Sequence, residues 1–441
     1  MLNAFSYQGV MDHLSSGIPH VLDFVRIIPI QCVRETQTIY CAALAVQFNL
    51  ICRELVLMKI EKISVTVFKI KSKKVNDTDG HTHPGPEHDS EEAMLTITTD
   101  DGHSGHAFGS PESLRPYVID NFVKKVFIDQ DPMDREKLWI NLAKWQRGSG
   151  ASLTDRTMAV AEMALWDLVG RCLDVPVWKL LGGYREKVPA YGSTMCGDEM
   201  AGGLATPADY GNFAEWMVNR GYKAIKLHTW MPPVSWAPSV KMDIQACAAV
   251  REAVGSDFPL MLDANHWYSR IDALELGRGI QDLGYYWYEE PMDEHSTESY
   301  RWLAENLDIP IIGPEYAYGK FHTRAEWIAS KACDISRVGV ADVGGIGPSM
   351  KIAHLAESFN MDCEIHGGGA GNLAVLGAIS NARWYERGLL HPFIDYDEIP
   401  SHLNSIIDPM DEDGNIPMPT RPGLGEDINF GYIAENVTSA Y

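Results

Sequence analysis

The chain has 441 residues, of which 45% are hydrophobic and 22% charged, and its formal net charge is −23. This composition is ordinary for a globular soluble protein, and the length accommodates two domains. The strong negative charge disfavours nucleic acid or an anionic membrane as a partner, although it says little about a small substrate. The eight cysteines are scattered and include no Cys-x-x-Cys pair, so we expect reduced thiols in a cytoplasmic protein.

The first 57 residues differ from the rest of the chain. They lack a basic start followed by an apolar core and a small-residue cleavage site, so we expect no secretory signal. The apolar stretch 39–52 contains Gln47 and Asn49 and has 14 residues, which makes it too polar and too short to span a bilayer. We predict that residues 1–57 are an N-terminal extension outside the catalytic fold. A helix that packs on a neighbouring subunit is the alternative.

A front domain is predicted for residues 58–185. Apolar residues alternate along 59–70 and along 93–99, which is typical of half-buried strands. Asp100-Asp101-Gly102 forms a hairpin turn into a third strand, so the strands make an antiparallel meander. Helical patterns follow in residues 116–126, 134–145 and 157–173.

A polar segment, residues 71–92, separates the first two strands of this meander. It is rich in Gly, Pro and acidic residues and contains His81, His83 and His88. We expect a solvated loop that can cover a substrate, and metal binding by the three histidines is the alternative.

Short apolar strands alternate with helical stretches along residues 186–390. This alternation is typical of a parallel sheet, and the number of units favours closure into a barrel. The final segment, 391–441, contains many Gly and Pro residues, and we expect it to return to the front domain. The predicted strands lie at 190–192, 224–227, 260–262, 286–288, 310–312, 335–340 and 362–365, and predicted helices include 212–220, 239–254 and 350–359.

Three of the predicted barrel strands lead into an acid. The acids are Asp263, Glu289 and Glu315, and they follow one another at intervals of 26 residues, about one strand-plus-helix unit. Carboxylates that end successive parallel strands gather at one mouth of a barrel, where they repel one another unless a cation lies among them. Hard oxygen ligands suit Mg²⁺ better than Zn²⁺. The sequence therefore predicts a metal-dependent enzyme.

Other polar residues are predicted at the same strand ends. Lys226 and His228 are two residues apart on an extended segment, so both side chains point to one face. Asn265 and His266 follow the third strand, and His366 follows the seventh. This set suits removal of a proton from the carbon next to a carboxylate, because Mg²⁺ neutralises the developing charge while a Lys or His takes the proton.

These motifs resemble the enolase superfamily, and within it the mandelate racemase subgroup, which includes many acid-sugar dehydratases. The resemblance covers residues 58 to about 429. It implies a modified TIM (β/α)7β-type barrel at 186–390, an α+β capping domain at 58–185, and a segment 391–441 that returns to it. It also implies Mg²⁺ held by Asp263, Glu289 and Glu315, and a homo-oligomer. The motifs that carry it are Ala161–Arg171, Leu180–Gly183, Asp263-Ala264-Asn265, Glu289-Glu290-Pro291, Gly344-Gly345 and Pro422–Gly425.

The chain departs from the family pattern at two positions. The second strand usually reads Lys-x-Lys, whereas here His228 occupies the position of the base, and Lys226 would hold a substrate carboxylate oxygen. The family orients the His that matches His366 with an Asp on the sixth strand, and that position is Gly339. Asp342 is three residues out of register, so we expect His366 to lack its orienting acid.

Four further residues are candidates for substrate binding. Asn265 and His266 follow the predicted metal ligand Asp263. His266 either reaches the substrate or supports the residues beside the pocket. Arg337 on the sixth strand either faces the substrate or packs. Asp395 falls where the family often has a Glu near the eighth strand.

The catalytic set of Lys226, His228 and His366 allows more than one reaction. We predict dehydration of a sugar acid to a 2-keto-3-deoxy acid, since polyhydroxy acids are the commonest substrates of the subgroup that the chain resembles. Racemisation, epimerisation or lactone cycloisomerisation through the same enolate is the alternative. Gly339 also leaves open a non-catalytic metal-binding barrel, whereas a zinc hydrolase would need a His-x-His that the strand ends lack.

Overall fold

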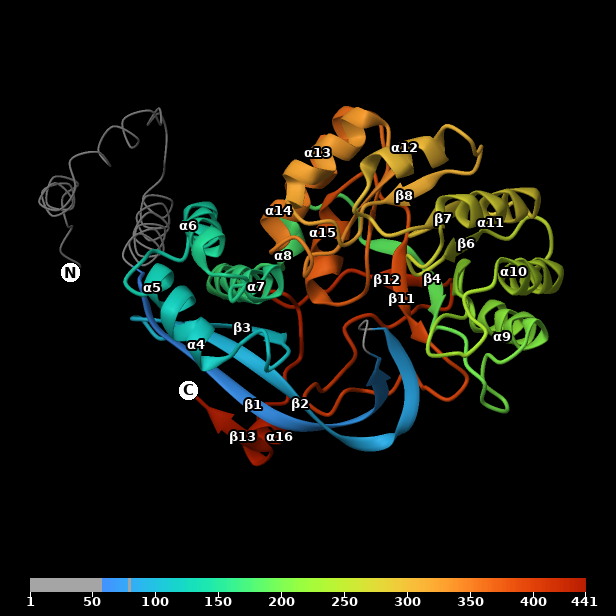
Figure 1. The fold of residues 1–441 in the computed structure, drawn as a ribbon. Coiled ribbons are helices and arrows are strands. Elements are labelled where there is room, and N and C mark those ends of the chain that lie inside the picture. Colours follow the sequence, from blue (N-terminus) through green and yellow to red (C-terminus); the bar gives the residue numbers. More distant parts are fainter. Residues whose placement is uncertain (1–57, 78–80) are drawn as a thin grey trace, which may run out of the picture. The chain divides into compact units, whose positions relative to one another are not determined.

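The computed structural model describes residues 58–77 and 81–441. Residues 59–441 form one compact unit, and the prediction for residues 1–57 lies outside the described residues. The unit 59–441 contains an antiparallel sheet with helices and a parallel barrel (Figure 1). Over residues 58–77 and 81–441, every helix falls short of the length and apolar character needed to cross a membrane.

An antiparallel sheet of four strands forms the cap, in the order β13-β1-β2-β3. Alternation along β1 buries Ile63, Val65 and Val67 in a core shared with the cap helices. Because β13 comes from the C-terminus and pairs with β1, the cap uses both ends of the unit 59–441 (Figure 1). The strands are β1 (Ile60–Asn76), β2 (Thr82–Thr99), β3 (Ser104–Gly109) and β13 (Val437–Ala440).

The predicted loop at residues 71–92 is wrong, because most of it forms a long β-hairpin. β1 and β2 remain paired as far as Asn76 and Thr82. Where water reaches both faces of an antiparallel ladder, neither face has to be apolar. The outer part of this hairpin therefore shows no alternation of hydrophobic and polar residues that would predict strands. Position 85 favours glycine, because a Cβ there would lie 2.8 Å from Val75 Cγ1, too close for an ordinary contact.

Helices pack against one another and against the cap sheet, at the positions the sequence predicted. The longest, α7, begins where Thr154 caps the Thr157 N–H and ends at Asp174 in the left-handed conformation. The cap helices are α4 (Pro116–Val118), the π-helix η1 (Ile119–Val123), α5 (Lys124–Phe127), α6 (Arg135–Gly148), α7 (Asp155–Leu173) and α8 (Val177–Leu180).

Eight parallel strands form the barrel in the order β10-β9-β8-β7-β6-β5-β4-β11, and each of the first seven along the chain is followed by a helix. The predicted (β/α)7β fold is therefore confirmed. Figure 1 shows the helices around the outside of the strands. The strands are β4 (Lys187–Thr194), β5 (Ala224–His228), β6 (Leu260–Asp263), β7 (Trp287–Glu289), β8 (Ile311–Gly313), β9 (Ile335–Val338), β10 (Cys363–Ile365) and β11 (Tyr385–Leu390). The helices are α9 (Pro207–Arg220), α10 (Val240–Val254), α11 (Arg270–Asp282), α12 (Thr297–Ala304), α13 (Lys320–Ser330), α14 (Ile346–Ser358) and α15 (Ala370–Ala378).

Side chains connect the two end strands of this parallel sheet. Glu364 on β10 accepts hydrogen bonds from the N–H groups of Arg383 and Trp384, which lead into β11, at 2.9 and 3.3 Å. The C-terminal segment then adds β12 (Asn415–Pro417) antiparallel to β4, followed by α16 (Phe430–Glu435) and β13.

Polar contacts hold the cap against the barrel. Lys320 at the start of α13 lies 2.5 Å from Asp155 of α7, and Trp139 donates to the Gly344 carbonyl at 2.6 Å. Glu162 on α7 accepts from the Ile346 N–H at the start of α14 at 2.8 Å. These contacts lie beside the loops that follow β8 and β9, and therefore close to the predicted site.

Candidate active site

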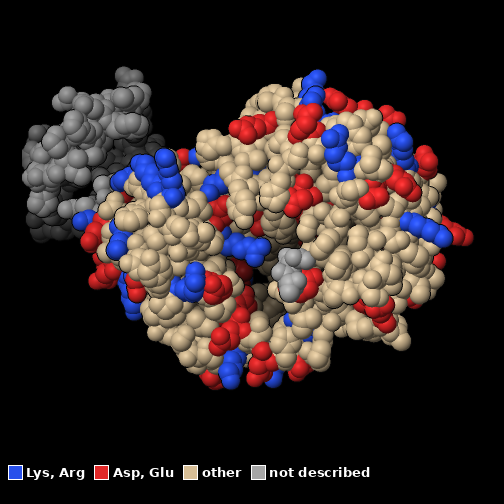
Figure 2. Space-filling model, in the orientation of Figure 1, with Lys and Arg blue, Asp and Glu red and all other residues tan. Residues whose placement is uncertain are grey.

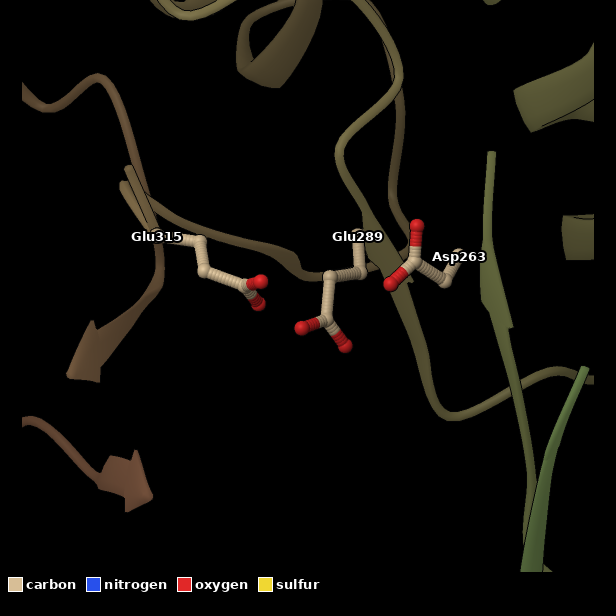
Figure 3. Close-up of side chains that lie close together, drawn as sticks. All are labelled: Asp263, Glu289 and Glu315. Atoms are coloured by element: carbon tan, nitrogen blue, oxygen red, sulfur yellow. The ribbon is translucent and has the colours of Figure 1, made fainter. Parts of the chain in front are cut away.

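The three predicted metal ligands lie together at the C-terminal end of the barrel strands. Asp263 ends β6 and Glu289 ends β7, and the two residues are paired in the parallel ladder. Glu315 follows β8, and all three side chains are buried. One carboxylate oxygen from each lies within 4.8 Å of the other two. Figure 3 shows the row in the order Glu315, Glu289, Asp263.

Two buried cations lie against this row of acids. Lys226 Nζ is 3.1 Å from Glu289 Oε2 and 3.3 Å from Asp263 Oδ2. Arg337 Nε is 2.7 Å from Glu289 Oε1. Burial raises the pKa of Asp263, but His228 and Lys226 outweigh it and hold this pKa below its usual range.

Glu386 on β11 is a fourth acid of the cluster that the sequence analysis missed. Its two carboxylate oxygens lie 3.1 Å from Lys226 Nζ and 2.7 Å from Arg337 Nη2. Burial raises its pKa, yet these two cations hold it well below the usual range. The available signal was the charged pair Glu386-Arg387 within the segment Tyr385–Leu390, because a charge rarely occupies a buried strand without a partner.

Two of the four candidates for substrate binding differ in their surroundings: Arg337 packs among the acids of the site, and Asp395 is exposed in a loop. Arg337 has no exposed surface, and its guanidinium is enclosed by Glu289, Glu315 and Glu386. Asp395 is exposed in the loop after β11, where its carboxylate accepts from the Asp397 N–H at 3.0 Å.

His228 lies at the Asp263 end of the row. Its Nε2 is 3.0 Å from Asp263 Oδ2, and its Nδ1 is 2.7 Å from the Thr194 carbonyl. A carbonyl oxygen only accepts, so Nδ1 carries a proton and donates it to Thr194. The other ring nitrogen, Nε2, faces the acids.

His366 lies at the opposite end of the row, beside Glu315. Its Nε2 is 3.0 Å from Glu315 Oε1, and its Nδ1 is 3.0 Å from Asp342 Oδ2. Burial lowers the pKa of His366, but the two carboxylates outweigh burial and raise this pKa to about 9.

Asp342 therefore orients His366, and the expectation that this His lacks an orienting acid is wrong. The loop after β9 brings Asp342 back over Gly339. A Cβ at Gly339 would lie 2.1 Å from Asp342 Oδ2 and 3.1 Å from His366 Nδ1. The carboxylate thus fills the space that a side chain at position 339 would take.

Asn265 and His266 follow Asp263 with left-handed backbone, at φ values of 53° and 57°. The Asn265 N–H donates to Asp263 Oδ1 at 2.9 Å and so holds that acid in place. The ring of His266 stacks on His81 from the tip of the β1–β2 hairpin, with centroids 5.4 Å apart. The hairpin therefore reaches the barrel end. Figure 2 shows a hollow between the cap and the barrel, bordered by side chains of both charges.

Comparison with known proteins shows the family. Residues 66–182 match the mandelate racemase / muconate lactonizing enzyme N-terminal domain, and residues 209–432 match the enolase C-terminal domain-like family. The chain belongs to the mandelate racemase and muconate lactonizing enzyme family of the enolase superfamily. The predicted resemblance is thereby confirmed.

Several members of this family are similar over most of the chain. Arabinonate dehydratase from Saccharolobus solfataricus is 31% identical over 79% of this chain and 91% of its own length. D-Galactarolactone cycloisomerase from Agrobacterium fabrum is 29% identical over 78% of this chain and 90% of its own length. The crystal structure of D-glucarate dehydratase from Agrobacterium tumefaciens, complexed with magnesium, is 62% identical with a TM-score of 0.86, and covers 87% of this chain and 100% of that one.

Proposed function

We propose that the protein is a magnesium-dependent dehydratase that converts a sugar diacid such as glucarate to a 2-keto-3-deoxy acid. The observation that carries the proposal is one imidazole at each end of a row of three buried carboxylates. His228 Nε2 lies 3.0 Å from Asp263, and His366 Nε2 lies 3.0 Å from Glu315. The diacid is chosen because of the 62% identity to a D-glucarate dehydratase.

Asp263, Glu289 and Glu315 would hold Mg²⁺. The donors fit this ion because they are hard carboxylate oxygens within 4.8 Å of one another. The charges fit as well. Five buried acids, these three with Glu386 and Asp342, face the cations Lys226, Arg337 and charged His366, which leaves two negative charges for a divalent ion to balance. When bound, Mg²⁺ would neutralise the negative charge that develops on the substrate carboxylate.

The two imidazoles would divide the proton transfers. His228 Nε2 takes the proton from the carbon next to the carboxylate, and the electron pair of that C–H bond forms the enediolate. The enediolate then expels the hydroxyl of the next carbon, and His366 Nε2 gives its proton so that water leaves. The resulting enol tautomerises to the 2-keto acid. Before this step His366 carries a positive charge, and the Asp342 carboxylate stabilises that charged form.

Racemisation, epimerisation or cycloisomerisation through the same enediolate is the second candidate. It is favoured by the same pair of imidazoles, since a 1,1-proton transfer needs a base on each face, and by the relative named as a cycloisomerase. The argument for a non-catalytic barrel was that Gly339 leaves His366 without an orienting acid. Asp342 supplies that acid, so this argument is weaker.

Single substitutions of the two histidines test the assignment. The protein is incubated with Mg²⁺ and glucarate in D₂O, and the α-proton and the keto acid are followed by NMR. We expect His228→Asn to abolish both α-deuteration and keto acid, and His366→Asn to lose keto acid while α-deuteration persists. An epimer or lactone in place of keto acid would identify the second candidate, and absence of all products across a panel of aldarates and aldonates would contradict both.

We also propose a homo-oligomer, since symmetric oligomers are common in the family that the chain belongs to. Light scattering of the purified protein would give its molar mass, and a mass equal to the 49.1 kDa chain would contradict the proposal.

A further inference from the structure

Glu315 differs from the other two acids of the row in how its backbone is held. Asp263 and Glu289 are the last residues of strands and are fixed by pairing to each other in the ladder. Glu315 lies beyond Gly313, where β8 ends. Its position therefore depends on contacts outside the sheet.

Glu294, from the loop after β7, makes the first set of these contacts. Its carboxylate accepts hydrogen bonds from three consecutive N–H groups, those of Glu315 at 2.5 Å, Tyr316 at 2.7 Å and Ala317 at 2.8 Å. Successive N–H groups directed at one point form a concave anion-binding turn, and a carboxylate makes stronger bonds there than a neutral acceptor.

Arg324 on α13 makes the second set, on the carbonyl groups of the same segment. Its Nη2 donates to the Glu315 carbonyl at 2.6 Å, and its Nη1 donates to the Ala317 carbonyl at 2.5 Å. The side chain is 1% exposed. A planar guanidinium suits this arrangement, because its donors form a rigid fork that a Lys cannot reproduce.

The segment 315–317 carries two groups that face the site. The Glu315 carboxylate lies 3.0 Å from His366 Nε2. The Tyr316 ring meets the ring of His366 edge-on, with centroids 5.5 Å apart. A shift of this backbone would therefore move a metal ligand and one side of the His366 ring together.

We propose that Glu294 and Arg324 are positioning residues that clamp the segment 315–317 and thereby set the affinity for Mg²⁺ and the placement of His366. The inference rests on the proposed function, because Glu315 is taken as a metal ligand. Lys226 contacts the carboxylates of the row directly, whereas the side chains of Glu294 and Arg324 contact backbone groups. Both act through the backbone of Glu315.

The main test is Glu294→Gln, with Glu298→Gln as the matched control. Glu298 begins the next helix and pairs at the surface with Arg301, so its loss leaves the segment 315–317 intact. Binding of Mg²⁺, or of Mn²⁺ as a probe, is measured by titration calorimetry without substrate, and folding is checked by circular dichroism. We expect Glu294→Gln to weaken ion binding at least tenfold and to lower kcat, Glu294→Asp to recover part of the affinity, and the control to match the unaltered protein.

A folded Glu294→Gln variant with ion affinity within twofold of the unaltered protein would overturn the inference. If that variant does not fold, Arg324→Lys serves instead, and the same tenfold loss is expected. Hydrogen exchange of the unaltered protein gives a measurement that needs no variant: slow exchange of the amides of residues 315–317 supports the clamp, and exchange at the rate of an open loop overturns it.

The outcomes separate this inference from the proposed function. If the unaltered protein binds the ion but makes no keto acid, the proposed function fails while the loss of affinity in Glu294→Gln still supports the clamp. If the protein makes keto acid and Glu294→Gln binds the ion normally, the clamp alone fails. If the unaltered protein binds no divalent ion, both fail.

Discussion

At the scale of single residues, Asp342 and Gly339 together place an acid beside His366. A His needs a partner on one ring nitrogen if the other is to exchange protons in a fixed tautomer. Here the acid comes from a loop and Gly339 leaves it room, since a Cβ there would lie 2.1 Å from Asp342 Oδ2. An acid at position 339 and an acid at position 342 would compete for the same space.

Asp342→Ala tests this arrangement. We expect kcat to fall about a hundredfold, because positioned acid–base groups contribute factors of this order. Adding Gly339→Asp to the same variant places an acid at the position usual in the family and should recover part of the loss. Steady-state kinetics are the measurement, and Asp395→Asn is the control at an exposed acid. An Asp342→Ala enzyme with unaltered kcat would show that His366 works without it.

The raised pKa of His366 predicts a pH dependence of stability in the metal-free protein. Burial lowers this pKa, whereas Glu315 and Asp342 raise it to about 9, from an unfolded value of 6.5. A folded pKa above the unfolded one stabilises the protein fully below pH 6.5, and this contribution is lost as the pH rises through 9. Urea unfolding in EDTA should show a loss of about 2–3 kcal/mol between pH 6 and pH 9.5 that His366→Gln lacks. Equal pH profiles of the two proteins would contradict this.

Single residues were predictable from the sequence where regular structure decides their position. Asp263 and Glu289 end parallel strands, so the spacing along the chain was enough to bring them together. Asp342 depends on the path of a loop, which no periodicity encodes. Glu386 was missed because its partners, Lys226 and Arg337, come from other strands and become neighbours only when the barrel forms.

At the scale of elements, apolar runs located the barrel strands because strands buried on both faces lack polar interruptions. The predicted strand 260–262 became Leu260–Asp263, and 310–312 became Ile311–Gly313. The β1–β2 hairpin was not predictable in the same way, since its outer half is polar on both faces and contains Pro84 and Pro86. The sequence analysis gave this segment a substrate-covering role as a solvated loop, because it is polar and rich in Gly and Pro.

His81→Ala tests the contribution of this hairpin to substrate binding. The imidazole stacks on His266 at 5.4 Å, and its Nδ1 is buried 3.6 Å from Asp77 Oδ2. We expect KM for the sugar acid to rise about five- to tenfold, the equivalent of one hydrogen bond, with Mg²⁺ affinity unchanged. His88→Ala is the control, because His88 lies on the same hairpin and its ring nitrogen Nδ1 lies 3.0 Å from the nearby Pro86 carbonyl, away from His266. An unchanged KM in His81→Ala would contradict a substrate-binding role.

At the scale of the whole molecule, the charge of −23 has a structural part. Several buried or half-buried acids each accept two or more backbone N–H groups from loops, from strand β3 or from the start of helix α14, and so hold these segments in place. Because these carboxylates replace water as the partner of buried N–H groups, they are held inside the fold and do not contribute to a surface that attracts cations. The acids are Glu162, Asp167, Asp198, Glu294 and Glu364.

Removal of residues 1–57 tests whether the catalytic fold is complete without them. Lys59–Tyr441 forms a compact unit, the family match begins at residue 66, and the D-glucarate dehydratase structure covers 87% of the chain. We therefore expect the chain 58–441 to keep its kcat, KM and melting temperature. Light scattering should accompany the kinetics, since the alternative is a helix that packs on a neighbouring subunit. A truncated protein with fewer subunits per oligomer and lower activity would favour that alternative. The loss of activity would then follow from the loss of assembly and not from a change in the site.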